Sequence, residues 1–117
     1  MRIELLYLKG CPGFKIALDR VYEALRKSGI DAPVEMVEVN SIEEAEARRF
    51  LGSPSIRING LDVEITARDS TDFGLTCRVY RTESGVEGSP SVEMINRAIL
   101  EALGAELRSS DIEGRKT

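Results

Sequence analysis

Four short segments of the chain carry the apolar patterns that are typical of β-strands. Residues 3–8 form a nearly unbroken apolar run, as expected of a strand that is buried on both faces of a sheet. Residues 34–39 are rich in Val and Met and predict a second strand. Residues 56–58 and 61–63 flank Asn59-Gly60, a pair that predicts a tight β-hairpin because both turn residues must take positive φ.

Three helices are predicted between and after these strands. The first has apolar residues at three- and four-residue spacing, with Pro12 at its first helical position and Gly29 at its end. The second is short and acidic, opens with the capping-box pair Ser41 and Glu44, and ends near residue 50. The third begins at Ser89-Pro90 and ends near Gly104.

Two segments lack a regular pattern. Residues 65–88 are polar and predict a long loop with one short extended piece, Cys77-Arg78-Val79-Tyr80. A loop of this length is uncommon without a functional reason. Residues 108–117 predict a disordered tail, in which Ile112-Glu113-Gly114-Arg115 matches a protease site of cloning vectors and indicates a partly vector-derived end. We therefore assign residues 1–107 to one domain and residues 108–117 to a tail.

The predicted order of elements is strand, helix, strand, helix, strand, strand, helix, which defines an α/β fold. The first half is a right-handed βαβ unit with two parallel strands. The hairpin adds an antiparallel pair, so that the expected core is a mixed four-stranded sheet (β-α-β-α-β-β-α). Helices can cover both faces of such a sheet, and the long loop precedes the last helix.

Composition narrows the range of functions. The net charge of -4 argues against binding to nucleic acid or to an anionic membrane. The aromatic residues are three Tyr and three Phe, so we do not expect an aromatic surface on which bases stack. No apolar stretch approaches the roughly 18 residues of a membrane helix, and the N-terminus is too short and acidic for a signal peptide, so we expect a cytoplasmic protein. The absence of histidine removes the commonest metal ligand and nucleophile-activating base, and we expect no cofactor.

The two cysteines carry the most distinctive chemistry. In a reducing compartment such residues are more often catalytic, redox-active or metal-binding than joined in a permanent disulfide. Cys11 is expected at the start of the first helix, where free N–H groups and the macrodipole favour a thiolate. Gly10 and Gly13 would let another molecule approach the backbone. The alternative is that Cys11 is a small buried apolar residue, as many free cysteines are.

A cysteine at the first strand–helix junction and a proline before the third strand resemble the thioredoxin-like superfamily over residues 2–104. The motifs are Gly10-Cys11-Pro12-Gly13-Phe14 and Ser53-Pro54-Ser55-Ile56. The resemblance implies that Pro54 is cis and faces Cys11, and that the Ser53 backbone pairs with substrate near Pro12 and Gly13. Thioredoxins carry Cys-x-x-Cys, whereas Phe14 stands at the second cysteine position, so the site has one thiol or uses Cys77.

A second stretch, which starts at Asp72-Phe73 and ends at Tyr80, resembles small thioredoxin-like proteins named for an Asp-Phe pair, some of which carry selenocysteine. The layout of the two cysteines also resembles the C-terminal domain of organomercurial (alkylmercury) lyases. Those lyases have an aspartate proton donor three residues after the first cysteine, where this chain has Phe14. The resemblance therefore implies mercury or thiol binding without carbon–mercury cleavage.

Three functions remain open. The leading hypothesis is a thiol-disulfide oxidoreductase-like protein, in which Cys11 reacts with a small thiol or a protein disulfide and either Cys77 or a small thiol resolves the product. The second is a soft-metal protein, in which both thiolates bind Hg(II) or Cu(I). The third is a non-catalytic interaction module of thioredoxin-like fold, in which neither cysteine is active. For Cys77 alone, the alternative to a resolving role is packing in the core beside Val79. Arg78 and Arg81 are interpreted as surface residues, and Tyr80 as a core residue with a hydrogen-bonded hydroxyl.

Overall fold

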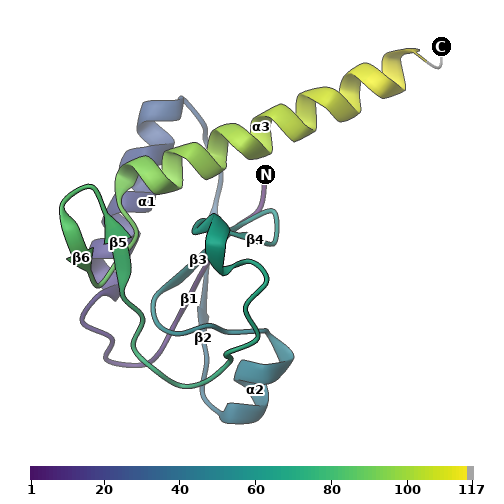
Figure 1. Cartoon of the computed structure of the whole chain (residues 1–117). Helices are drawn as coiled ribbons and strands as arrows, with labels where there is room; N and C mark the ends of the chain where they lie inside the picture. The colour runs from purple at the N-terminus through teal and green to yellow at the C-terminus, as the bar shows by residue number, and fades with distance from the viewer. Residues whose placement is uncertain (116–117) are drawn as a thin grey trace.

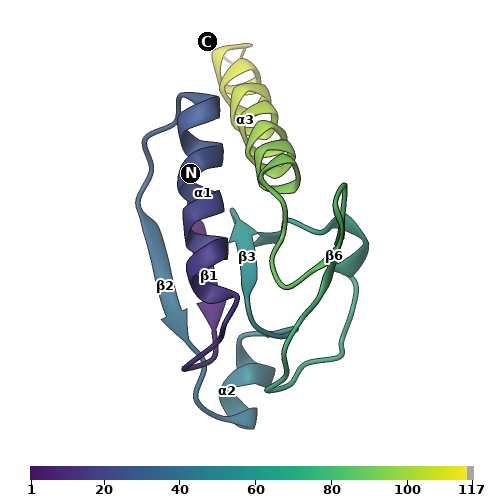
Figure 2. The ribbon, with the colours of Figure 1, turned by 90° about the vertical axis from the view of Figure 1, so that its left-hand side faces the viewer.

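A central sheet carries helices on both faces in the computed structural model, which describes the backbone of residues 1–115 and the side chains of residues 1–108 (Figures 1 and 2). The sheet has the strand order β2-β1-β3-β4. Its strands are β1 (Ile3–Tyr7), β2 (Val34–Glu38), β3 (Ser55–Ile58) and β4 (Leu61–Asp62). The helices are α1 (Phe14–Ser28), α2 (Ile42–Ala47) and α3 (Val92–Arg115). A separate hairpin is formed by β5 (Tyr80–Thr82) and β6 (Gly85–Glu87), and η1 (Ile65–Ala67) is a 3₁₀ turn.

The strand pairing confirms the predicted mixed sheet. β1 pairs in parallel with β2 and antiparallel with β3, and β3 pairs antiparallel with β4. Asn59 and Gly60 join the last two strands with φ values of 53° and 82°, the positive values that the predicted turn requires. The Asn59 side-chain oxygen accepts the Arg2 N–H at 2.8 Å, which holds the turn against the start of β1.

The larger of two apolar cores lies between one face of the sheet and the helices α1 and α3. Ile3 and Leu5 of β1 point into it, and its remaining fully buried members include Ala17, Val21, Ala24, Ile56, Ile95 and Ile99. Since side chains alternate along a strand, Leu6 points to the opposite face. There it packs with Val39, Ala45 and Phe50 beneath α2. The helices thus cover both faces, as predicted.

Two helix ends follow the local signals in the sequence. Gly29 caps α1 with φ 66°, as expected, and its N–H donates to Arg26 O at 3.2 Å. Ser41 caps α2, because its Oγ accepts the Glu44 N–H at 3.1 Å. The Glu44 carboxylate accepts the N–H of Asn40 at 2.9 Å instead of the N–H of Ser41. α2 ends at Ala47, earlier than predicted.

Helix α3 is longer than its pattern indicates. The predicted end near Gly104 is wrong, because the helix continues to Arg115 and projects away from the rest of the fold (Figure 1). A glycine inside a helix costs only about 1 kcal/mol relative to alanine, and the residues after it include strong helix formers. The predicted tail, residues 108–117, therefore begins inside this helix, and residues 116–117 lie outside the described part of the chain.

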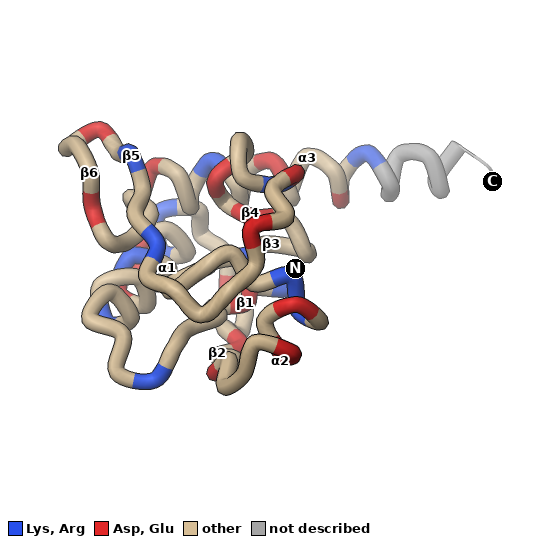
Figure 3. Tube along the Cα trace, turned by 60° about the horizontal axis from the view of Figure 1, so that its bottom comes forward, with Lys and Arg blue, Asp and Glu red and all other residues tan. Residues whose placement is uncertain are grey.

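Charged residues of both signs are spread along the fold in the view of Figure 3. Neither sign is confined to one element of secondary structure there. Among the helices that the structure describes, none combines the length and apolar character needed to cross a membrane.

Residues 65–88 contain more regular structure than the long loop that the sequence predicts. They include η1 and the β5–β6 hairpin, and Cys77 forms an isolated parallel bridge with Ser53. The predicted extended piece at residues 77–80 therefore corresponds to this bridge and to the first residue of β5. The hairpin turn ends on Gly85 with φ 113°. Its strands have three residues each, which is too short for a recognisable alternation.

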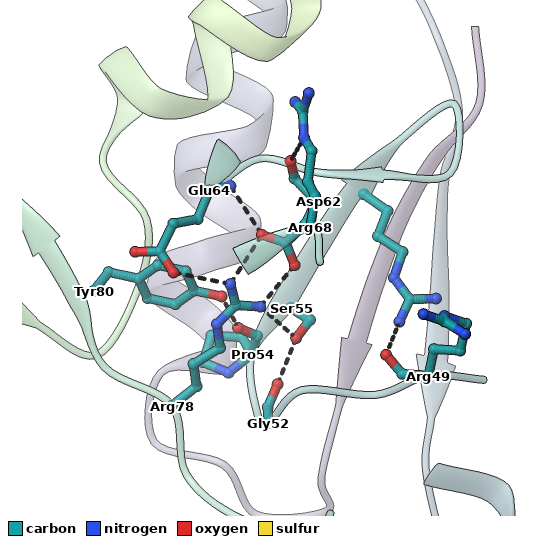
Figure 4. Close-up of polar contacts among 10 residues, drawn as sticks. Arg49, Gly52, Pro54, Ser55, Asp62, Glu64, Arg68, Arg78 and Tyr80 are labelled. Carbon is teal, nitrogen blue, oxygen red and sulfur yellow. Dashed lines mark hydrogen bonds and ion pairs between the residues drawn. The ribbon is translucent and has the colours of Figure 1, made fainter. Parts of the chain in front are cut away.

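A buried arginine organises this segment (Figure 4). Arg78, which the sequence interpretation placed on the surface, is 9% exposed. Its guanidinium donates to both carboxylate oxygens of Asp62 at 2.7 and 2.9 Å, to Ser55 Oγ at 2.9 Å and to Glu64 at 3.2 Å. Burial opposes its charge, but the bonds and charges of these partners outweigh that effect and raise the pKa of Arg78.

The aromatic ring of Tyr80 covers the same arginine. Its centroid lies 4.5 Å from the guanidinium carbon of Arg78, within the range of a cation–π contact. The Tyr80 hydroxyl donates to the carbonyl of Pro54, which confirms a buried tyrosine with a hydrogen-bonded hydroxyl. We call Arg78 and its partners Asp62, Ser55, Glu64 and Tyr80 the Arg78 cluster. This cluster connects the segment before the hairpin to the start of β3.

We expect the substitution Arg78→Met to lower the free energy of unfolding by about 3–5 kcal/mol, because it leaves the buried Asp62 carboxylate without its partner. The double substitution Arg78→Met/Asp62→Leu should recover most of that loss, since neither charge then remains buried alone. Urea unfolding at neutral pH measures both differences.

The matched control is Arg81→Met, a change at an exposed position three residues later in the chain. It should alter the free energy of unfolding by no more than about 0.5 kcal/mol. Equal stability of Arg78→Met and the wild type, or a double variant no more stable than the single one, would contradict the structural role assigned to this ion pair.

Candidate functional site

Both cysteine-bearing segments contact Ser53, the residue before Pro54. The N–H of Leu8, three residues before Cys11, donates to Ser53 Oγ at 2.9 Å. The Ser53 N–H donates to Thr76 O and the Ser53 carbonyl accepts from the Arg78 N–H, each at 2.9 Å, so that Cys77 lies opposite Ser53. The fold therefore brings two segments that are remote in sequence to one residue.

Two consecutive turns position Cys11. Its N–H donates to Leu8 O at 3.1 Å, and Gly10 takes φ 75°, as the third residue of a type II turn does. Its carbonyl accepts the Phe14 N–H at 3.2 Å. Pro12 is the second residue of this next turn, and Gly13, with φ -84° and ψ -7°, has the third-residue geometry of type I. Cys11 is partly exposed between the two turns.

The prediction that the helix begins at Pro12, directly after Cys11, is wrong. Helix α1 begins at Phe14 with Gly13 as its N-cap, so Cys11 and Pro12 both precede it. Pro12 fits either position, because the first helical residue and the second residue of a type I turn require nearly the same φ. The turns, and not the helix, define where the thiol lies.

The two turns between Leu8 and Phe14 form the Cys11 loop. Glycine at position 13 allows this loop to pack closely on its neighbours. A Cβ there would lie 2.5 Å from the carbonyl oxygen of Gly88 and 3.2 Å from Pro54 Cδ. The Ser53–Pro54 peptide bond is cis, as the resemblance implied, and Pro54 is fully buried. The predicted neighbourhood of Pro54 and the Cys11 loop is therefore present.

Phe14 occupies the position of the second cysteine of a Cys-x-x-Cys motif. Its ring packs on Tyr7, with the two centroids 4.4 Å apart and the planes inclined at 42°. This aromatic contact joins the end of β1 to the start of α1. The side chain thus has a packing role at the place where thioredoxins have their second thiol.

A hollow of about 230 Å³ lies beside the Cys11 loop, between α1 and the segment that follows β6. It is lined by Pro12, Gly13, Ile16, Arg20, Glu87, Gly88 and Ser89. The side chain of Ile16 is half exposed and gives the hollow an apolar wall. Sequence reasoning identified Pro12 and Gly13 as binding residues but missed Ile16, because an exposed Ile on a helix carries no distinct signal.

Arg20 closes one side of this hollow. It donates to the Glu87 carboxylate at 2.8 Å and to the Pro90 carbonyl at 3.1 Å, and so ties β6 to α1. The hydrogen bond from Arg20, together with one from Thr82, lowers the pKa of Glu87. This pair was also missed, since its members lie 67 residues apart in the sequence.

Both backbone groups that the predicted pairing of Ser53 with a substrate would use are occupied in this structure. Its N–H and its carbonyl are both already bonded to residues 76–78, and Ser53 is 2% exposed. Gly52, with φ 126°, allows the close approach of that segment, because a Cβ there would lie 3.0 Å from Arg78 Cβ. Cys77 itself is exposed, and the thiols of Cys11 and Cys77 are both free.

Comparisons with known proteins identify no relative of this chain. No family model matches it, and no curated protein and no solved structure matches it either. The case for its function therefore depends on the geometry of its own residues.

We expect Gly13→Ala to lower the free energy of unfolding by about 1–3 kcal/mol, because the added methyl group meets the backbone of Gly88. The same change should alter the rate at which iodoacetamide alkylates Cys11. The control is Gly88→Ala, whose Cβ would meet nothing within 4 Å. It should change stability by no more than about 0.5 kcal/mol. Identical behaviour of the two variants would argue against this packing.

The lowered pKa of Glu87 makes a prediction about pH. A carboxyl group whose folded pKa lies below its ordinary value of 4.5 stabilises the fold above that pH, and the contribution is lost as the pH falls through the folded pKa. Glu87→Gln should therefore be less stable than the wild type near pH 7, and the difference should shrink near pH 3. Urea midpoints at the two pH values test this, and a pH-independent difference would contradict it.

Proposed function

We propose that this protein is a thiol-dependent redox protein of thioredoxin-like fold, in which Cys11 is the reacting thiol and Cys77 the resolving thiol. The observation that carries the proposal is the double contact of Ser53 with the Cys11 turn and with the Cys77 segment. Two features support the thioredoxin-like fold. The sheet carries α1 and α3 on one face and α2 on the other, and the cis Pro54 lies beside the Cys11 loop.

The reaction proposed is thiol–disulfide exchange. The Cys11 thiolate attacks one sulfur of a small-molecule or protein disulfide, forms a mixed disulfide and releases the other sulfur as a thiolate that takes a proton from solvent. The Cys77 thiolate then attacks the Cys11 sulfur and releases the second substrate thiolate. The substrate gains two electrons and the Cys11–Cys77 pair loses two, so an external thiol must restore the pair for another turnover.

The hollow beside Cys11 supports the binding of a substrate with an apolar group. Pro12 and Gly13, the two residues after Cys11, line it, and Ile16 provides the apolar wall. Cys77 would approach from the other side of Ser53, on a segment held by two backbone hydrogen bonds. The internal disulfide requires the two Cα atoms to come within about 7 Å, so limited movement of this exposed segment would favour its formation.

A second candidate function, soft-metal binding, uses the same two thiols. Two thiolates suffice for a near-linear Hg(II) or Cu(I) ion. Within the described residues, no group of three or more His, Cys, Asp or Glu side chains is arranged to hold a metal ion. The placement of both cysteine segments beside Ser53 therefore favours a two-ligand ion over one that needs more ligands.

Mass spectrometry of the intact protein distinguishes these functions. Dilute hydrogen peroxide should oxidise Cys11 to a sulfenic acid, which Cys77 converts to a disulfide with loss of water, so that the wild type loses two hydrogen atoms. In Cys77→Ser the sulfenic acid should persist and be trapped by dimedone. In Cys11→Ser no internal disulfide should form.

Addition of Hg(II) to the reduced protein provides the second arm. Metal binding would replace redox chemistry as the proposed function if three results are found together. The wild type binds one ion per chain, each single serine variant fails to bind it, and peroxide forms no internal disulfide. No reaction of either cysteine with peroxide or Hg(II) would overturn both and leave a non-catalytic interaction module. Circular dichroism of the serine variants shows whether their fold is retained.

A further inference from the structure

A second hollow, of about 110 Å³, lies on the α2 side of the sheet, away from the larger core. Ile56 and Ile58 of β3 point into that core, so Arg57 between them points to the opposite face. The hollow is lined by Arg57 together with Arg49 and Arg68, and its apolar walls include Leu61 and Phe73. Figure 4 shows Arg49 and Arg68 together with the residues that contact Arg78. The thiol chemistry proposed above uses none of these residues.

Two charges at the edge of this hollow are already neutralised. Arg68 donates to the two carboxylate oxygens of Glu101 at 2.9 and 2.7 Å and to the Asp62 carbonyl at 2.8 Å. The carboxylate of Asp62 is held by Arg78 at 2.7 Å. Neither group therefore offers an unsatisfied charge to a ligand.

Arg49 and Arg57 differ, because the ion pairs formed among residues 1–108 include neither of them. Arg57 Nη2 donates to the Arg49 carbonyl at 2.6 Å, which holds the two residues together. The Arg49 guanidinium lies over the Phe73 ring, 5.1 Å from its centroid. Burial lowers the pKa of Arg57, although the charges of Glu4 and Asp62 oppose the effect. An anion between the two guanidinium groups would offset both the burial and their mutual repulsion.

The backbone of Arg49 is an independent observation. Arg49 follows the C-cap of α2 and takes φ 56°, a left-handed conformation that is most often occupied by glycine. A residue with a Cβ is disfavoured sterically in this conformation. The same conformation directs the Arg49 carbonyl to Arg57.

We propose that Arg49 and Arg57 bind the phosphate group of a small ligand in this hollow. Two guanidinium groups match the charge of a phosphate near pH 7, about -1.5 to -2, better than that of a single carboxylate. Their planar N–H groups suit paired hydrogen bonds to its oxygens. The hollow has room for a phosphate group but not for a nucleoside, so the rest of an organic ligand extends past the half-exposed Leu61.

Nuclear magnetic resonance of the full chain tests this proposal. Inorganic phosphate, titrated at constant ionic strength, should cause saturable shifts in the side-chain N–H signals of Arg49 and Arg57. The variants Arg49→Gln and Arg57→Gln should each weaken binding by at least about tenfold. The matched control is Arg48→Gln, because Arg48 is exposed, is bonded to Glu44 and does not line the hollow. It should bind phosphate as the wild type does.

Phenyl phosphate distinguishes the two sources of the phosphate group. Tighter binding than inorganic phosphate indicates an organic phosphate that contacts Leu61 or Phe73, and equal or weaker binding indicates the free ion. The absence of saturable shifts overturns the proposal, and so does wild-type affinity in Arg49→Gln. That variant remains decisive if Arg57→Gln fails to fold, because the side chain of Arg49 is exposed. Equal loss of affinity in Arg48→Gln would reveal a general effect of surface charge and reject the site.

Discussion

The buried ion pair between Arg78 and Asp62 determines where the polar segment of residues 65–88 runs. Neither charge can be buried alone without a large desolvation cost, so the segment must pass where Arg78 reaches the end of β4. This constraint places the next residues as well. Cys77 lies opposite Ser53, and Tyr80 lies against Pro54. The position of the second thiol is therefore a consequence of an electrostatic contact some distance from it.

The two faces of the sheet have different chemistry. The face under α1 and α3 is apolar, and the Cys11 loop lies at the end of β1 next to that core. The face toward α2 combines a small apolar cluster with the arginines and carboxylates around Asp62. β3 contributes to both faces, because Ile56 and Ile58 point to one and Ser55 and Arg57 to the other. The residues of the proposed thiol site and those of the proposed phosphate site therefore do not overlap.

Segment 76–78 has a specific consequence for the proposed redox chemistry. It occupies both backbone groups of Ser53, which the resemblance to thioredoxins assigned to a substrate. The hollow beside Pro12 and Ile16 stays open next to the Cys11 loop. The second cysteine of the chain, Cys77, lies in the segment that occupies these two groups of Ser53.

Features that depend on a few neighbouring residues were determined by the sequence alone. The Asn59-Gly60 hairpin, the Gly29 end of α1 and the Ser41 cap of α2 follow from local φ preferences and hydrogen bonds. The apolar patterns likewise specified the mixed sheet and the helices on its faces. The placement of Pro12 failed because two local structures accept the same φ, and a proline cannot choose between them.

Features that depend on a partner far along the chain were decided by the tertiary structure. The burial of Arg78 requires Asp62, and the lining of the first hollow requires Arg20 and Glu87. The hollow on the other face combines residues between Arg49, just after α2, and Phe73. A charged residue reads as exposed in a sequence, because whether it can be buried depends on a counter-charge whose distance only folding defines. The two cysteines are also remote from each other in the sequence. The sequence therefore identified both of them, but only the fold placed their segments at Ser53.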